Sequence, residues 1–215
     1  DYILNLEEDG HKKFMEYLLR SAIVQRDKRR KGWGIRYLPS SGFGVYAARD
    51  FMEGEVALSF EDLPHRLLST ATIEKMTEDE KQRVYATSFH LSNDLFYAPA
   101  SNPENWRPVN HSCDPTLWLQ PKSLKLVARR LIKKGEELSV DYGMLFTEEL
   151  PTFACTCKKK NCRKMITGTD YQLPQCQAYD THRSPYILDI IGGRYIPSDQ
   201  FDKNITALPH LSVAE

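Results

Sequence analysis

The sequence predicts a mainly β protein, built from several small sheets with helices at the periphery. From residue 32 to residue 60, short apolar stretches alternate with glycines and other turn residues, which is typical of strands joined by tight turns. Residues 48–60 and 128–142 repeat one pattern, a polar turn with a glycine followed by apolar residues at every second position. Apolar residues follow helical spacing only near the ends of the chain and in one insertion. This distribution indicates small sheets as the centre of the fold.

Three helices are expected. Apolar residues near helical spacing predict an amphipathic helix over residues 12–25. Thr77 and Glu80 match a capping box, in which each side chain bonds the other residue's backbone, and they predict a helix over residues 78–86. A third, short helix is expected around residues 186–191, in a region that we expect to pack onto the core.

Length and charge limit the function classes. The 215 residues suit one domain, or one domain with an appended piece. Because 29 Lys+Arg balance 29 Asp+Glu, the formal net charge is zero, which excludes a uniformly basic nucleic-acid binder. Basic blocks at residues 122–134 and 158–164 leave direct contact with nucleic acid open, without supporting it. No apolar stretch approaches the roughly 20 residues of a membrane-spanning helix, so no membrane partner is expected.

The five cysteines are too few for a disulfide scaffold at this length, so metal binding or catalysis is the favoured use. Cys155, Cys157 and Cys162 form a C-x-C-x4-C pattern on a short lysine-rich loop. A tetrahedral structural zinc site needs a fourth ligand, and Cys113 and Cys176 are the remaining candidates. The alternative is a set of unpaired thiols. Zinc binding would supply folding free energy that the side chains of this loop cannot.

Residues 42–47 fit the dinucleotide fingerprint G-x-G-x-x-A, but their context disfavours it. That fingerprint follows a buried strand and opens a helix, whereas here Pro39 precedes the motif and a polar turn at Gly54 ends any helix early. The glycines on either side of Phe43 can still expose backbone N–H groups to an anionic ligand, and a simple turn is the alternative.

Residues 110–115 combine an amide, an imidazole, a hydroxyl and a thiol. A nucleophilic Cys–His pair is disfavoured because adjacent residues seldom face each other and no separate base stands out. A well hydrogen-bonded turn is the alternative. Tyr142 stands at the end of a predicted strand. Taken alone, it indicates no special role, because a buried tyrosine hydroxyl needs only a hydrogen-bond partner.

Four segments, taken in this order and at these separations, resemble the SET-domain protein lysine methyltransferases. They are Gly42-Phe43-Gly44 with Gly54-Glu55, then Arg107 to Pro115, then Glu137 to Tyr142, and then Cys155 to Cys162. The resemblance covers about residues 33–167. It implies a SET fold of several small curved β-sheets, with a pseudoknot of the Asn110 and Tyr142 segments and a C-terminal zinc-binding cap.

The resemblance also implies roles for individual residues. S-adenosylmethionine would be held by seven residues, namely Gly42, Phe43, Gly44, Arg107, Asn110, His111 and Tyr142. Tyr142 would be the catalytic residue, at the point where the methyl donor meets the lysine amine. Cys113 would be the fourth ligand of a Zn²⁺ ion, beside Cys155, Cys157 and Cys162, which leaves Cys176 unused.

The pocket for the lysine departs from the family pattern at two positions. Val140 stands two residues before the tyrosine, where the family commonly carries Phe or Tyr, and Phe60 stands where many members have a tyrosine. We expect Tyr85 or Tyr97 to compensate for the hydroxyl missing at Phe60. A smaller residue at Val140 predicts a roomier pocket and therefore di- or trimethylation.

The expected domain organisation follows from these assignments. Residues 96–107, rich in proline and asparagine, are expected to form a loop within the SET domain. An N-terminal helical segment is expected over residues 1–31, followed by a SET domain over residues 32–150 with a helical insertion at about 64–90. A zinc loop over residues 151–170 and a C-terminal extension over residues 171–215 complete the chain.

The sequence therefore predicts an S-adenosylmethionine-dependent protein lysine N-methyltransferase. A histone tail is the usual substrate of the family, with H3 the first expectation, and chromatin in the nucleus is the expected location, with the cytoplasm as the alternative. Two other functions stay open: a non-catalytic SET module that binds a peptide or partner, and a methyltransferase for a non-histone protein.

Overall fold

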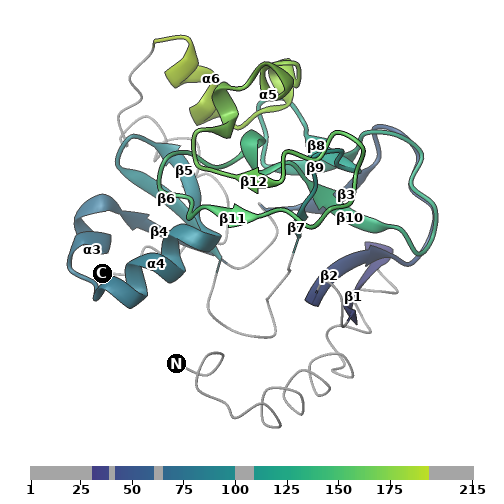
Figure 1. Cartoon of the computed structure of the whole chain (residues 1–215), viewed down its shortest axis with the longest axis horizontal. Helices are drawn as coiled ribbons and strands as arrows, with labels where there is room; N and C mark the ends of the chain where they lie inside the picture. The colour runs from purple at the N-terminus through teal and green to yellow at the C-terminus, as the bar shows by residue number, and fades with distance from the viewer. Residues whose placement is uncertain (1–30, 39–41, 61–64, 100–108, 194–215) are drawn as a thin grey trace, which may run out of the picture.

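The computed structural model describes residues 31–38, 42–60, 65–99 and 109–193, which form four small sheets and several short helices (Figure 1). The helix expected over residues 12–25 lies outside the described residues. Within the described part, no helix is long and apolar enough to cross a membrane. The prediction of a mainly β fold with small sheets and peripheral helices is confirmed.

The sheet that carries the central motifs has four strands in the order β1-β2-β10-β7. They are β1 (Trp33–Leu38), β2 (Gly42–Ala47), β10 (Glu137–Val140) and β7 (Asn110–His111). The pairs β1–β2 and β2–β10 are antiparallel, whereas β10 and β7 are parallel. The parallel pair joins the Asn110 segment to the segment that ends at Tyr142, as the expected pseudoknot requires.

The other sheets are smaller. One has the order β3-β9-β8, another β4-β6-β5, and β11 pairs with β12. Their bounds are β3 (Val56–Ser59), β9 (Lys125–Ala128), β8 (Leu117–Leu119), β4 (His65–Ser69), β6 (Leu95–Pro99), β5 (Phe89–Ser92), β11 (Phe153–Ala154) and β12 (Met165–Ile166). Figure 1 shows the β4-β6-β5 sheet on one side of the molecule and the β1–β2 hairpin on the opposite side.

The two repeated segments of the sequence meet in space. Gly54 and Gly135 adopt positive φ angles of 79° and 95° in their turns, as glycine allows without strain. An isolated antiparallel bridge pairs Phe51 with Ile132, and both side chains are fully buried. The two repeated segments are therefore paired with each other, and their apolar side chains pack into one core.

The insertion contains a sheet as well as helices. Helix α3 spans Thr70–Glu74 and helix α4 spans Glu78–Thr87. The predicted capping box is confirmed, since the Thr77 hydroxyl accepts from the Glu80 backbone and the Glu80 carboxylate accepts from the Thr77 backbone. Strands β4 and β5 flank these helices and pair with β6.

The prediction of a loop over residues 96–107 was wrong for its first residues, because residues 95–99 form β6. Phe96, Tyr97 and Ala98 are buried, and β6 lies between two antiparallel partners. Burial of this apolar run outweighs the turn preference of the proline that ends it. Residues 100–108 of the expected loop lie outside the described part.

The C-terminal region packs against the core through short helices: η2 (Tyr142–Met144), η3 (Asp170–Gln172), α5 (Pro174–Gln177), η4 (Asp180–His182) and α6 (Pro185–Ile191). Helix α6 matches the expected third helix and begins one residue earlier. Cys176, Tyr179 and Ile187 are buried, and Ser184 donates its N–H to the Met144 carbonyl at 2.7 Å. These contacts tie the C-terminal segment to the turn that contains Tyr142.

Candidate active site and metal centre

The parallel pairing of β7 with β10 places Asn110 and His111 beside the end of β10. The register sets Ser139 opposite Asn110 and Val140 opposite His111. Beyond β10 the chain turns into the 3-10 helix η2, whose first residue is Tyr142. Tyr142 therefore stands two residues beyond the end of the strand that pairs with His111.

The backbone N–H and the hydroxyl of Tyr142 are both bonded to the Asn110 segment. Its N–H donates to Nδ1 of His111 at 3.1 Å, and its hydroxyl donates to the Val109 carbonyl at 3.1 Å. The rings of His111, Phe146 and Phe153 lie 5.3, 4.8 and 5.8 Å from the Tyr142 ring. Burial, with a smaller effect of the Glu137 carboxylate, raises the pKa of Tyr142 to about 12. The hydroxyl is therefore neutral at physiological pH.

His111 is a neutral imidazole with one defined tautomer. Nδ1 accepts the Tyr142 N–H, so the proton sits on Nε2, which lies 3.3 Å from Sγ of Cys113. Burial lowers the pKa of His111 to about 4, although the Asp141 carboxylate opposes the shift. The 3.7 Å approach of Nδ1 to Asp141 is thus not an ion pair near neutral pH.

The glycine motif packs against Asn110. The Asn110 amide donates to the Phe43 carbonyl and to Oε1 of Glu137, both at 2.7 Å. A Cβ at Gly44 would lie 2.5 Å from Oε1 of Glu137 and 3.0 Å from the Asn110 amide nitrogen, so a side chain there would displace the Glu137 carboxylate from its bond with Asn110. Gly42 has a φ of 74°, and a Cβ there would meet no atom within 4 Å. Of the seven residues expected at a methyl-donor site, these contacts link Phe43, Gly44, Asn110, His111 and Tyr142. Gly42 precedes Phe43 in the chain, and Arg107 lies outside the described residues.

The expected pocket residues divide into two groups. Val140 is buried opposite His111, and Phe60 lies against the rings of Phe89 and Tyr97 at 5.4 and 5.6 Å. The Tyr97 hydroxyl donates to the Phe60 carbonyl at 3.0 Å, so its proton is already engaged. Tyr85 packs in a separate apolar cluster of the insertion, 5.8 Å from the Phe96 ring.

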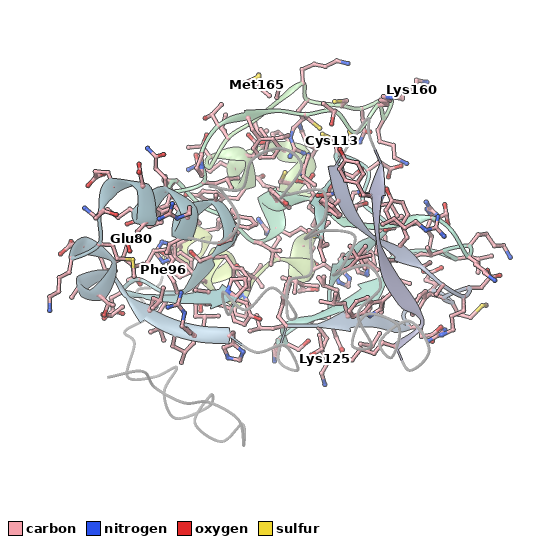
Figure 2. All side chains as sticks on the ribbon, turned by 90° about the horizontal axis from the view of Figure 1, so that it is seen from below. Glu80, Phe96, Cys113, Lys125, Lys160 and Met165 are labelled. Carbon is pink, nitrogen blue, oxygen red and sulfur yellow. The ribbon has the colours of Figure 1, made fainter. Side chains whose placement is uncertain are left out.

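Four cysteines gather at one point of the structure, and we call them the thiol cluster. Their Sγ atoms all lie within 4.8 Å of one another, and those of Cys113 and Cys155 are 3.8 Å apart: Cys113, Cys155, Cys157 and Cys162. A tetrahedral ion with Zn–S bonds of about 2.3 Å requires S–S distances of about 3.8 Å. The thiol cluster therefore fits a zinc site in donor type, number and size. Figure 2 shows Cys113 beneath the loop that carries Lys160.

The environment of the thiol cluster shifts its members in opposite directions: burial raises the pKa of Cys113 and of Cys155, whereas that of Cys157 falls. The N–H of Arg163 donates to Sγ of Cys113 at 3.3 Å. Burial raises the pKa of Cys157, but backbone N–H groups of Cys113 and Lys159 act against it and the pKa falls to about 7. Cys176 is buried elsewhere in the core, where a Cβ at Gly143 would lie 2.7 Å from its Sγ.

Three residues that surround the site were not predicted from the sequence. Phe153 on β11 lies 6.0 Å from the His111 ring as well as against Tyr142. Asp141 and Arg163 form a buried ion pair at 2.6 Å. Asp141 and Arg163 are each adjacent to a motif residue in the chain, because Asp141 directly precedes Tyr142 and Arg163 directly follows Cys162. That adjacency was the available signal.

Comparisons with known proteins agree with this arrangement. Residues 42–143 match the family model of the SET domain. The Drosophila melanogaster histone-lysine N-methyltransferase trr is 28% identical over 163 residues, which cover 71% of this chain and 7% of that protein. The Drosophila melanogaster histone-lysine N-methyltransferase Su(var)3-9 is 30% identical over 149 residues, which cover 59% of this chain and 23% of that protein.

A solved structure of KRYPTONITE in complex with mCHG DNA and SAH is similar at a TM-score of 0.44 and 21% identity, covering 62% of this chain and 28% of that chain. This chain spans less than a quarter of the length of either Drosophila relative. The matched region runs from the glycines of β2 through the Asn110 segment to the turn at Tyr142. The chain therefore contains a SET domain, which spans residues 42–143.

Proposed function

We propose that this chain is a protein lysine N-methyltransferase that uses S-adenosylmethionine and carries one structural zinc ion. The observation that carries the proposal is the neutral hydroxyl of Tyr142, fixed beside His111 and Asn110 inside a SET domain. The two relatives described above, both histone-lysine N-methyltransferases, support the same reaction class.

The residues around β2 suit the methyl donor. Gly42, Phe43, Gly44, Asn110 and His111 would hold S-adenosylmethionine, which would supply a methyl group activated on a sulfonium. The open space at the Cβ position of Gly42 is compatible with a ligand that approaches the backbone closely. Arg107 and Tyr142 complete the predicted set.

The main task of the protein is alignment. Methyl transfer from a sulfonium to an amine is an in-line displacement, which is accelerated by holding donor and acceptor in the reacting geometry and excluding water. The lysine amine must first lose its proton. With a reference pKa of about 10.4, deprotonation at pH 7 costs roughly 4.6 kcal/mol. An apolar surrounding lowers that cost because it disfavours the ammonium form.

Tyr142 suits the role of positioning the amine. Its hydroxyl hydrogen points to the Val109 carbonyl, so the lone pairs of the oxygen are free to accept an N–H of the substrate. Accepting that bond would orient the nitrogen lone pair without adding a negative charge. Because its pKa is raised to about 12, Tyr142 does not serve as a general base near neutral pH.

We further propose a histone tail as the substrate, with H3 first, and therefore chromatin in the nucleus as the place of action. The names of the relatives support a histone lysine as acceptor. The small side chain of Val140 favours a pocket that accepts a lysine already carrying one methyl group.

Replacing Tyr142 with Phe is expected to lower kcat about 100-fold, because the ring contacts remain while the group that orients the amine is lost. The measurement is transfer of labelled methyl groups to an array of histone and non-histone peptides. Tyr171→Phe is the matched control, since it removes a buried tyrosine hydroxyl that bonds Glu148. Equal transfer by wild type and Tyr142→Phe would overturn the mechanism.

The rate is expected to rise with pH from 7 to 10 as more of the bound lysine becomes neutral. Tyr142 stays protonated across this range because burial raises its pKa to about 12, so it adds no downward break. The check is kcat against pH, with circular dichroism at each pH to exclude unfolding. A fall in kcat with an apparent pKa near 10 in folded protein would contradict the assignment.

Exhaustive turnover on the best peptide is expected to give di- or trimethyl-lysine, because Val140 leaves room beside the amine. Mass spectra over the time course measure this directly. Product that stops at one methyl group would show that other side chains fill the space.

The protein is expected to contain one zinc ion, lost in Cys113→Ser and retained in Cys176→Ser, because only the first variant removes a member of the thiol cluster. Elemental analysis gives the metal content. A chelator should lower the melting temperature of wild type and Cys176→Ser far more than that of Cys113→Ser. The reverse pattern of metal content would assign the fourth ligand to Cys176.

A further inference from the structure

Arg163 makes a buried, fully directed set of side-chain bonds. Its two terminal nitrogens donate to the two carboxylate oxygens of Asp141 at 2.6 and 2.7 Å, and Nε donates to Asp170 at 2.8 Å. The side chains of Arg163 and Asp170 are 7% exposed and that of Asp141 is 0% exposed. This fork geometry suits arginine and no other cation.

Asp141 is the residue that starts the turn of Tyr142. It is the N-cap of η2, and its Oδ1 accepts the N–H of Gly143 at 3.0 Å. The Tyr179 hydroxyl donates to Oδ2 at 2.9 Å. With the two bonds from Arg163, each carboxylate oxygen accepts two hydrogen bonds. The position of Asp141, and with it the start of the Tyr142 turn, is therefore fixed from several directions.

The backbone of Arg163 contacts the thiol cluster. It directly follows Cys162, and its backbone N–H donates to Sγ of Cys113 at 3.3 Å. The neighbouring Asn161 side chain donates to the Cys113 carbonyl at 2.8 Å. One residue thus contacts both the cysteine loop and the residue before Tyr142.

Loss of this contact would have a specific consequence. Burial raises the pKa of the Asp141 carboxyl, and the bonds from Arg163 hold it below its ordinary value. A buried carboxylate that loses its cation is left uncompensated, so it takes up a proton, admits water or moves. Each of these outcomes shifts the cap of η2 and with it the hydroxyl of Tyr142.

We propose that Arg163 is a positioning residue, which transmits the order of the cysteine loop through Asp141 to Tyr142. This inference rests on the proposed function for its kinetic consequence, whereas its structural consequence can be measured without any turnover. It assigns the cysteine loop a part in alignment, in addition to its part in folding.

The test uses two variants and one control. Arg163→Lys keeps the positive charge beside Asp141 but loses the fork, and Arg163→Gln removes the charge as well. Arg129→Gln is the control, because Arg129 bonds Asp114 at 2.7 Å, directly after the cluster residue Cys113, and makes no contact with the Tyr142 turn among the described bonds. Each protein is checked for zinc content and melting temperature.

The first readout is hydrogen–deuterium exchange of the peptide that contains Tyr142, Gly143 and Met144. Their N–H groups bond His111 Nδ1, Asp141 Oδ1 and the Asp141 carbonyl. In Arg163→Lys we expect exchange at least about tenfold faster there, with unchanged exchange in β5 and β6 and with one zinc retained. Arg129→Gln should exchange as wild type does.

The second readout is kinetic. Arg163→Lys should lower kcat about tenfold with KM for peptide changed less than about threefold, and Arg163→Gln should lower kcat further. In a Tyr142→Phe background, the same changes should have little added effect on kcat, because Arg163 acts through Tyr142. If Arg163 had a purely structural role, the loss of kcat in its variants would add to the loss caused by Tyr142→Phe.

The outcomes separate the two proposals. Wild-type exchange at the Tyr142 peptide in both Arg163 variants would overturn the inference, whatever the activity. Kinetic effects that add in the Tyr142→Phe background would also overturn it. Faster exchange in a protein whose wild type methylates no peptide would support the coupling and overturn the proposed function alone.

Discussion

The parallel contact between β7 and β10 is the interaction on which the rest of the structure depends. It pairs only Asn110 and His111 with Ser139 and Val140, yet it joins segments separated by the whole β8–β9 hairpin. Parallel strands need a long connection, and here that connection forms its own sheet with β3. Because the pairing is so short, side chains must stabilise it. The Asn110 amide bonds the Glu137 carboxylate of β10 and also reaches the Phe43 carbonyl of β2, the next strand beyond β10.

The same region holds a concentration of buried charge that a purely structural core would avoid. Asp141 and Arg163 would gain nothing in stability over well-packed apolar residues, because desolvation of both ions offsets their attraction. What the pair provides is direction: every oxygen of Asp141 has its bonds assigned by geometry. A site that must align two reacting groups benefits from such directed bonds more than from additional apolar contact.

Local chemistry made much of this structure predictable. The turns at Gly54 and Gly135 and the cap at Thr77 depend on neighbouring residues, so the sequence alone was enough to predict them. The spacing of Cys155, Cys157 and Cys162 indicated a metal site, and the total of five cysteines limited the fourth sulfur to two candidates. Strand β6 could not be predicted in this way, because it lies between the adjacent β5 and the more distant β4. The Asp141–Arg163 pair could not be predicted either, because it depends on a partner 22 residues away in the chain. Roles for Gly42, His111 and Val140 in binding stay predictions.

A chain of hydrogen bonds explains why the thiol cluster and the tyrosine lie so close together. Sγ of Cys113 accepts the Nε2 proton of His111, and this leaves Nδ1 with a free lone pair. That lone pair accepts the N–H of Tyr142, which is the bond that orients the backbone at the start of η2. The opposite tautomer would place a proton against the Tyr142 N–H and repel it. The acceptor at Cys113 and the cation at Arg163 thus constrain the Tyr142 turn from its two sides, the first through His111 and the second through Asp141.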